Sequence, residues 1–156
     1  MPFTLSSSAF VSGGDIPLVF TCDGENVPPH LNWSAAPPGA RSFALIMDDP
    51  DAPAGPFTHW VGFDIPANRS DMPSGRPSDA IGVSGRNSRG QVGYMGPCPP
   101  SGTHRYYFRL FAFRLFALDV PSLSLKAGAS RQQVEETIAR HTVGTAELMG
   151  RYSRRK

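Results

Sequence analysis

The chain has 156 residues, including 16 glycines and 16 prolines; 40% of its residues are hydrophobic and only 18% are charged. This balance excludes a disordered chain, which would be more charged and less apolar, and the length fits a single domain, 1–156, with its own core. The net charge is +2, but four of the fifteen basic residues lie in the last six positions, so the body lacks the basic surface of a nucleic-acid-binding protein.

Those last six positions, 151–156, are expected to form a solvated basic tail. No run approaches the roughly 18 apolar residues of a membrane-spanning helix. The first residues lack the basic and apolar regions of a signal peptide, so the sequence predicts a cytoplasmic protein with no transmembrane segment.

The many glycines and prolines indicate frequent turns and favour a β-rich fold. Alternation and β-branched or aromatic content predict short strands, and the run 43–47 is apolar enough for a strand buried on both faces. The remaining strands of the first half are expected over 16–20, 31–33 and 58–65. Residues 68–93 are polar and glycine-rich, which predicts a long surface excursion.

The segment 104–118 is apolar on both faces and long for one strand, so a central strand with a bulge is expected. One helix follows, because Ser130 and Gln133 match a capping box. Gly144 is expected to stop this helix, and 146–152 to return as a last strand.

Two clusters could carry chemistry. The first, 48–59, places Asp48, Asp49 and Asp51 among prolines at a strand end and then His59 in the next strand. Prolines stiffen the loop, so the acids would form a rigid polar rim. The alternative is an ordinary solvated turn.

The second cluster, 93–106, is a glycine and proline loop that leads into the long strand. His104 and Tyr106 are two positions apart, so both side chains lie on one face. The alternatives are a histidine satisfied within the core, and Cys98 acting as a nucleophile with His104 as its base. The common hydrolase, phosphate-loop and zinc-protease motifs are absent.

At these clusters the sequence resembles the phosphatidylethanolamine-binding protein family, in its bacterial Raf-kinase-inhibitor-like (YbhB/YbcL) branch. The resemblance covers almost the whole chain, and its motifs occur in order: Asp49-Pro50-Asp51-Ala52-Pro53, His59, Gly96-Pro97-Cys98-Pro99-Pro100 and His104-Arg105-Tyr106. It implies an antiparallel β-sandwich with a large central sheet, a smaller second sheet and one or two short helices.

The resemblance also implies a small pocket for phosphate-like anions. Its expected walls are Asp49, His59, Gly96, Cys98, Pro99, His104 and Tyr106. Imidazole, phenol and loop N–H groups can all donate to phosphate oxygens, and Asp49 is expected to orient a histidine. The family's unusual cis bonds would fall at Ala52–Pro53 or Gly55–Pro56.

The predicted function is therefore a non-catalytic binding module for a phosphate-like anion or a phospholipid headgroup. An inhibited kinase or protease as protein partner is implied by family analogy alone, and no cofactor is expected. The alternative is a metal-assisted hydrolase that uses His59 and His104 with Asp49 or Asp51. A homodimer and a disulfide between Cys22 and Cys98 are left open.

Overall fold

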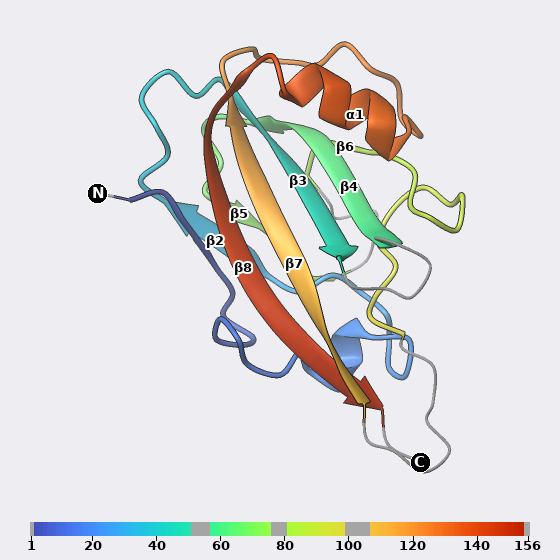
Figure 1. The fold of residues 1–156 in the computed structure, drawn as a ribbon. Coiled ribbons are helices and arrows are strands. Elements are labelled where there is room, and N and C mark those ends of the chain that lie inside the picture. The colour runs from blue at the N-terminus through green and yellow to red at the C-terminus, as the bar shows by residue number, and fades with distance from the viewer. Residues whose placement is uncertain (1, 51–56, 76–80, 99–106, 155–156) are drawn as a thin grey trace.

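The computed structural model describes residues 2–50, 57–75, 81–98 and 107–154. The elements, in chain order, are β1 (Thr4–Ser6), the 3-10 helix η1 (Leu18–Phe20), β2 (Leu31–Ser34), β3 (Ser42–Asp49), β4 (Phe57–Pro66), β5 (Asp71–Met72), β6 (Val83–Ser84), β7 (Tyr107–Leu118), α1 (Arg131–Ile138) and β8 (Thr142–Arg154). The strands form a three-stranded sheet, β1-β2-β5, and a five-stranded sheet, β6-β4-β3-β7-β8 (Figure 1). This confirms the mainly β fold with a large and a small antiparallel sheet.

Strand β3 is the centre of the large sheet. All eight of its residues are buried, and it pairs antiparallel with β4 on one side and β7 on the other. The prediction of a strand buried on both faces is confirmed. Because side chains alternate along a strand, Phe43 and Met47 enter the core between the two sheets, whereas Ala44 and Ile46 enter a second core beside α1.

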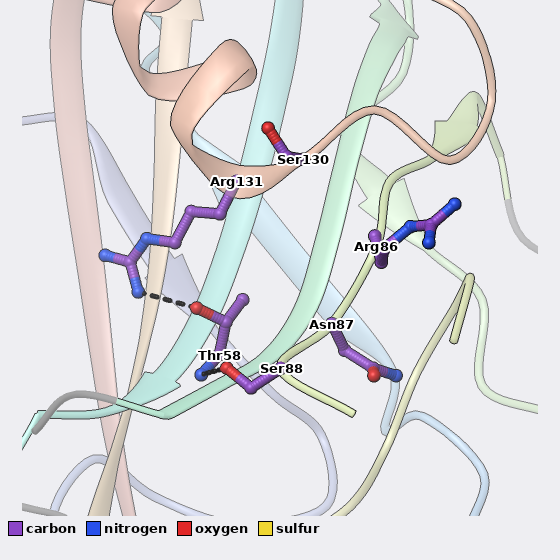
Figure 2. Close-up of a pocket in the computed structure, with 6 residues that line it drawn as sticks. All are labelled: Thr58, Arg86, Asn87, Ser88, Ser130 and Arg131. Carbon is purple, nitrogen blue, oxygen red and sulfur yellow. Dashed lines mark hydrogen bonds between the residues drawn. The ribbon is translucent and has the colours of Figure 1, made fainter. Parts of the chain in front are cut away.

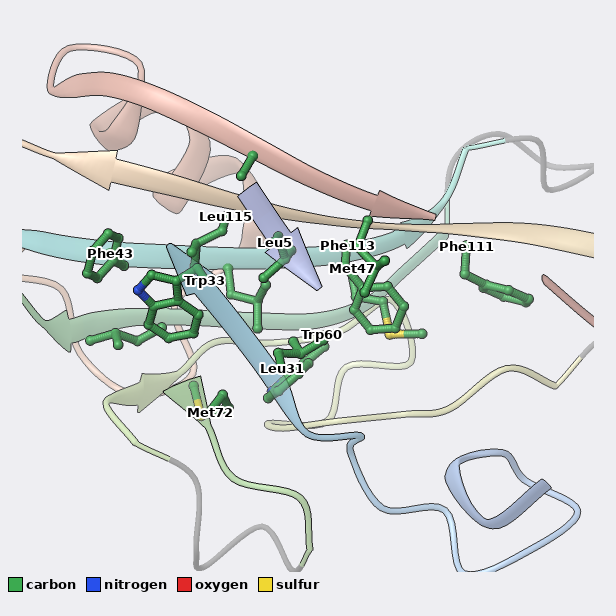
Figure 3. Close-up of a cluster of buried hydrophobic side chains, with 14 of the residues drawn as sticks. Leu5, Leu31, Trp33, Phe43, Met47, Trp60, Met72, Phe111, Phe113 and Leu115 are labelled. Atoms are coloured by element: carbon green, nitrogen blue, oxygen red, sulfur yellow. The ribbon is translucent and has the colours of Figure 1, made fainter. Parts of the chain in front are cut away.

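The core between the sheets is the larger of the two. Figure 3 shows Trp33 of the small sheet packed beside Phe43 of β3, with ring centroids 5.3 Å apart. Phe111 and Phe113 of β7 are fully buried in the same cluster. On the other face of β7, Ala112 and Leu118 are buried but Leu110 is 36% exposed, so the predicted cover on both sides is only partial. The ladder with β8 is irregular between Ala117 and Leu118, which is the expected kind of bulge.

Helix α1 begins where its capping box predicts. The Ser130 hydroxyl accepts from the Gln133 amide, and the Gln133 side chain accepts from the Ser130 amide. Val134 and Ile138 are buried against the sheet. The helix ends at Ile138, and Gly144, the predicted stop, instead lies within β8. Neither α1 nor any other helix of the described residues has the length and apolarity to cross a membrane.

Two further expectations are corrected. Residues 16–20 do not form a strand. Pro17 has no N–H group and cannot donate to a neighbouring strand. The Phe20 amide donates to the Pro17 carbonyl at 3.1 Å, and this bond closes the turn of η1.

The solvated tail does not begin at 151, because β8 continues to Arg154. The Ile16 amide donates to the Arg151 carbonyl at 2.7 Å, and the Arg151 side chain pairs with Asp15 at 2.7 Å. The candidate cis bonds at Pro53 and Pro56 lie outside the described residues.

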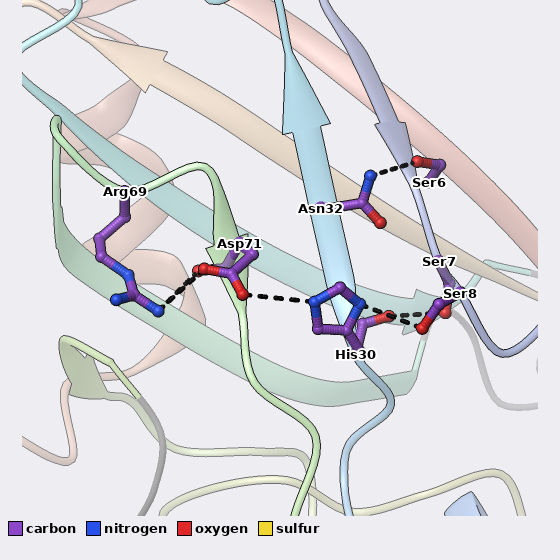
Figure 4. A network of polar contacts seen from close by, with 7 residues as sticks. All are labelled: Ser6, Ser7, Ser8, His30, Asn32, Arg69 and Asp71. Carbon is purple, nitrogen blue, oxygen red and sulfur yellow. Dashed lines mark hydrogen bonds and ion pairs between the residues drawn. The ribbon is translucent and has the colours of Figure 1, made fainter.

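A polar network ties the small sheet together (Figure 4). His30 Nε2 lies 3.3 Å from Asp71 Oδ2 and its Nδ1 lies 3.2 Å from the Ser8 hydroxyl. Arg69 donates to Asp71 at 2.9 Å, and the Ser7 hydroxyl donates to the His30 carbonyl at 2.6 Å. These contacts join the segments around β1, β2 and β5, so this histidine has a structural role.

Candidate functional site

The candidate site lies where β3 ends and β4 begins. The last two residues of β3, Asp48 and Asp49, are 2% and 4% exposed. Asp48 is held on the α1 side of the sheet, where its Oδ2 pairs with Arg131 at 2.9 Å and with Arg114 at 3.6 Å. Alternation therefore places Asp49 on the opposite side, which His59 shares.

His59 is held rigidly within this site. Its ring centroid lies 5.0 Å from that of Phe57 and 5.2 Å from that of Phe111, which it meets edge to face. Its Nδ1 lies 2.8 Å from the Met95 carbonyl oxygen. Because a carbonyl only accepts, Nδ1 carries the proton in this contact, and Nε2 is the nitrogen left for other partners.

Burial lowers the pKa of His59 below its ordinary value of 6.5, because the charged form loses its hydration. The Met95 backbone and the negative charge of Asp49 oppose this effect. The imidazole is therefore neutral at pH 7, and an anion placed beside it would favour its protonation. Asp49 acts on His59 through its charge, while the acceptor that orients Nδ1 is the Met95 carbonyl, which sequence reasoning missed.

The loop 94–98 is bound on its far side to the segment 20–26. The Tyr94 hydroxyl donates to the Phe20 carbonyl at 2.6 Å, and the Gly96 amide donates to Asn26 Oδ1 at 2.8 Å. This differs from the expectation that loop N–H groups donate to the ligand, since the Gly96 amide is already used. A Cβ at position 96 would overlap the Phe20 carbonyl, so glycine here permits close packing of two backbones.

A disulfide joins the same two segments. Cys22 and Cys98 are bonded, with their Cα atoms 5.4 Å apart, and the Cys22 amide donates to the Pro97 carbonyl at 3.2 Å. The question left open by the sequence is thereby answered for this structure. Cys98 has no thiol in this state, so it cannot act as the nucleophile considered above.

Asp49 lies close enough to His59 to act on it through its charge, and His59 contacts Met95 of the loop that also holds Gly96 and Cys98. Pro99, His104 and Tyr106 lie outside the described residues, as does Asp51 of the metal hypothesis. Within the ranges that are described, no group of three histidine, cysteine or carboxylate side chains is arranged to hold a metal ion. No motif in the sequence pointed to Asn26 or Phe111, because their contacts arise only from the folding of distant segments.

Comparison with known proteins gives one consistent result. A family model described as "Phosphatidylethanolamine-binding protein" matches residues 6–153. The chain is 47% identical over 155 residues to a UPF0098 protein of Methanothermobacter thermautotrophicus, covering 96% of this chain and 98% of that one.

Two solved structures have nearly the same fold. CT736 of Chlamydia trachomatis, described as a phosphatidylethanolamine-binding protein homologue, superposes with a TM-score of 0.88 at 34% identity and covers 98% of each chain. YbcL of E. coli, described as a member of the mammalian PEBP family, has a TM-score of 0.88 at 29% identity, covering 97% of this chain and 98% of that one.

Proposed function

Because this chain belongs to the phosphatidylethanolamine-binding protein family, we propose that it is a non-catalytic binding protein whose pocket at the rim of the large sheet takes a phosphate-bearing ligand. The observation that carries the proposal is His59, a buried imidazole whose Nδ1 is fixed by the Met95 carbonyl beside the Asp49 carboxylate. Such a ring offers one defined N–H donor, Nε2, as soon as it is protonated.

The surroundings of His59 suit an anion that brings its own charge. In an apolar wall of Phe57 and Phe111, a hydrogen bond between imidazolium and phosphate is stronger than in water. Asp49 supports the imidazolium form through its charge, which offsets part of the cost of burial. We expect Pro99, His104 and Tyr106 to supply the remaining walls and donors.

Three classes of ligand carry the phosphate group that this pocket would bind. They are a phospholipid headgroup, a phosphorylated small molecule and a phosphorylated side chain. All three present the same oxyanion, and a small pocket would contact mainly that group. An inhibitory role toward a kinase or protease would then follow from capture of a phosphorylated side chain of that partner.

The test is a titration followed by amide chemical shifts, which locate the binding. We expect O-phosphoethanolamine and inorganic phosphate to shift the amides of Met95 and Gly96 at pH 6. His59→Gln should weaken this binding about tenfold or more, the usual cost of losing a charge-assisted hydrogen bond.

His141→Gln is the matched control, because His141 is also paired with a carboxylate, Asp119, but lies at the α1 end of β8. It should leave the affinity unchanged. Equal affinity of wild type and His59→Gln would overturn the proposal. A preference for phosphoethanolamine over inorganic phosphate would favour a headgroup, and equal affinities would favour the bare phosphate group.

A further inference from the structure

A hollow lined by polar residues lies on the face of the large sheet away from Met95, under the first turn of α1. Its volume is about 140 Å³, several times the ~30 Å³ that one water occupies in the liquid. Its lining comes from the start of β4, the loop after β6 and the start of α1: Thr58, Arg86, Asn87, Ser88, Ser130 and Arg131 (Figure 2). Thr58 is adjacent to His59 in sequence, but its hydroxyl contacts Arg131, on the side of the sheet away from Met95.

Three hydroxyl groups face this hollow, and each is already fixed as an acceptor. Thr58 Oγ1 accepts from Arg131 at 3.0 Å, Ser88 Oγ accepts from the Thr58 amide at 2.7 Å, and Ser130 Oγ accepts from the Gln133 amide at 3.1 Å. None of the three has a described group to which it donates. Thr58 is the most telling, because it is only 5% exposed and still keeps an unused O–H.

The charges around the hollow differ on its two sides. The charge of Arg131 is offset by two carboxylates, since it pairs with Asp48 at 2.9 Å and with Glu135 at 3.2 Å. Arg86 stands on the opposite side and is exposed, and its guanidinium has no ion-pair partner among the described residues. Its head points outward in Figure 2, and a turn of its flexible side chain would bring a free positive charge over the hollow.

We propose that this hollow is a second binding site, which takes a small oxyanion such as inorganic phosphate. Unused O–H groups can only donate, so they need a ligand rich in acceptors. A metal cation does not fit, because the lining residues include no carboxylate, histidine or cysteine and Arg86 would repel it. The side-chain amide of Asn87 donates to the Gly93 carbonyl and accepts from the amides of Arg89 and Gln91, so it holds the loop.

The experiment is a titration of the full chain with inorganic phosphate, followed at the amides of Ser88, Ser130 and Arg131. Saturable shifts of these amides are expected for wild type. Arg86→Gln and Thr58→Val should each weaken the binding by about threefold to tenfold, since one removes the free charge and the other removes the buried hydroxyl while keeping the shape of the side chain.

Arg89→Gln is the matched control, because Arg89 is an exposed arginine of the same loop that does not line the hollow. Amides that do not shift with phosphate would overturn the proposal. So would shifts that are the same in Arg86→Gln, Thr58→Val and Arg89→Gln, since these would show only a general effect of ionic strength.

The two sites can be separated in one series. His59→Gln should abolish the shifts of Met95 and Gly96 and leave those of Ser88 and Ser130 in place. If the first site fails and the second remains, the proposed function is wrong and the second site stands; the reverse pattern rejects only the second site.

Discussion

Thr58 and His59 are neighbours on β4, yet their side chains are fixed on different sides of the large sheet. Thr58 Oγ1 accepts from Arg131 of α1, whereas His59 Nδ1 donates to the Met95 carbonyl of the loop 94–98. One short stretch of strand therefore contributes a side chain to each of the two proposed sites. Because each side chain is buried and held by a named partner, substitutions at the two positions test the two faces independently.

The pH dependence of anion binding at His59 has a predicted sign. Burial keeps the pKa of His59 below 6.5, so the free protein is neutral there at pH 7. A bound anion favours the imidazolium, and affinity should therefore rise as the pH falls from 7 toward the lowered pKa and level off below it. Sulfate is the right probe, because phosphate monoesters change charge near pH 6. The amide shifts of Met95 and Gly96 measure the affinity between pH 5 and 8, and a profile identical in His59→Gln would contradict the prediction.

The same histidine should make folding less stable in mild acid. Between pH 6.5 and the lowered pKa, the unfolded chain takes up a proton at His59 that the folded chain does not, so the free energy of unfolding decreases as the pH falls through that window. Urea unfolding at several pH values measures this slope. His59→Gln should flatten the slope relative to wild type, and parallel curves would rule out His59 as its source.

Local features of the chain predicted much of the fold. The apolar run 43–47 has enough information in itself to specify a doubly covered strand, and Ser130 with Gln133 marks the start of α1. The end of that helix was misplaced, because its last turn meets the sheet at Ile138 and the chain then pairs with β7. The local sequence around the helix does not specify that pairing with a distant strand.

The residues of the candidate site came from motifs in the sequence, whereas their contacts could not be predicted from it. Asp49, His59 and Gly96 were found through motifs, but the partner of His59 is a backbone carbonyl, and any residue type could have supplied it. The hollow under α1 left no motif at all. Thr58, Ser88 and Ser130 come from three segments, and their unused hydroxyls become apparent only when every hydrogen bond around them is known.

The disulfide should contribute strongly to stability. It links positions 76 apart, and the loss of chain entropy for a loop of that size corresponds to roughly 4.5 kcal/mol. The double variant Cys22→Ser, Cys98→Ser should therefore unfold at a clearly lower denaturant concentration than wild type, and reduction of wild type should give the same shift.

A count of free thiols tests the disulfide directly, and its result also distinguishes an oxidising from a reducing compartment. Denatured, unreduced protein should show no free thiol, as expected in an oxidising compartment, whereas a reducing cytoplasm keeps cysteines as thiols. Two free thiols in protein purified without reductant would contradict the bond. Loss of the bond should also weaken anion binding at His59, because Cys98 and Met95 belong to one short loop.

The buried carboxylate of Asp48 predicts a large effect for its partner. Its side chain is 3% exposed and pairs with Arg131 at 2.9 Å. Removing the arginine, as in Arg131→Met, leaves the buried carboxylate with only the longer contact to Arg114 at 3.6 Å and should cost about 3 kcal/mol, at the low end for a broken buried ion pair. The variant Asp48→Asn with Arg131→Met should recover part of that loss. Additive effects in chemical unfolding of the two single variants and the double variant would show that the two side chains are not coupled.

Gly96 gives the sharpest test of how the loop 94–98 is held. A Cβ there would lie 2.6 Å from Asn26 Oδ1 and even closer to the Phe20 carbonyl, so Gly96→Ala must push two backbone segments apart. We expect a loss of about 2 kcal/mol, typical of overpacking, together with weaker anion binding, because Met95 fixes His59 from the same loop. Gly62→Ala is the matched control, since the nearest atom to its Cβ is the Val83 carbonyl oxygen at 3.9 Å. If both variants unfold at the same denaturant concentration, the close approach of the two segments at Gly96 does not exist in solution.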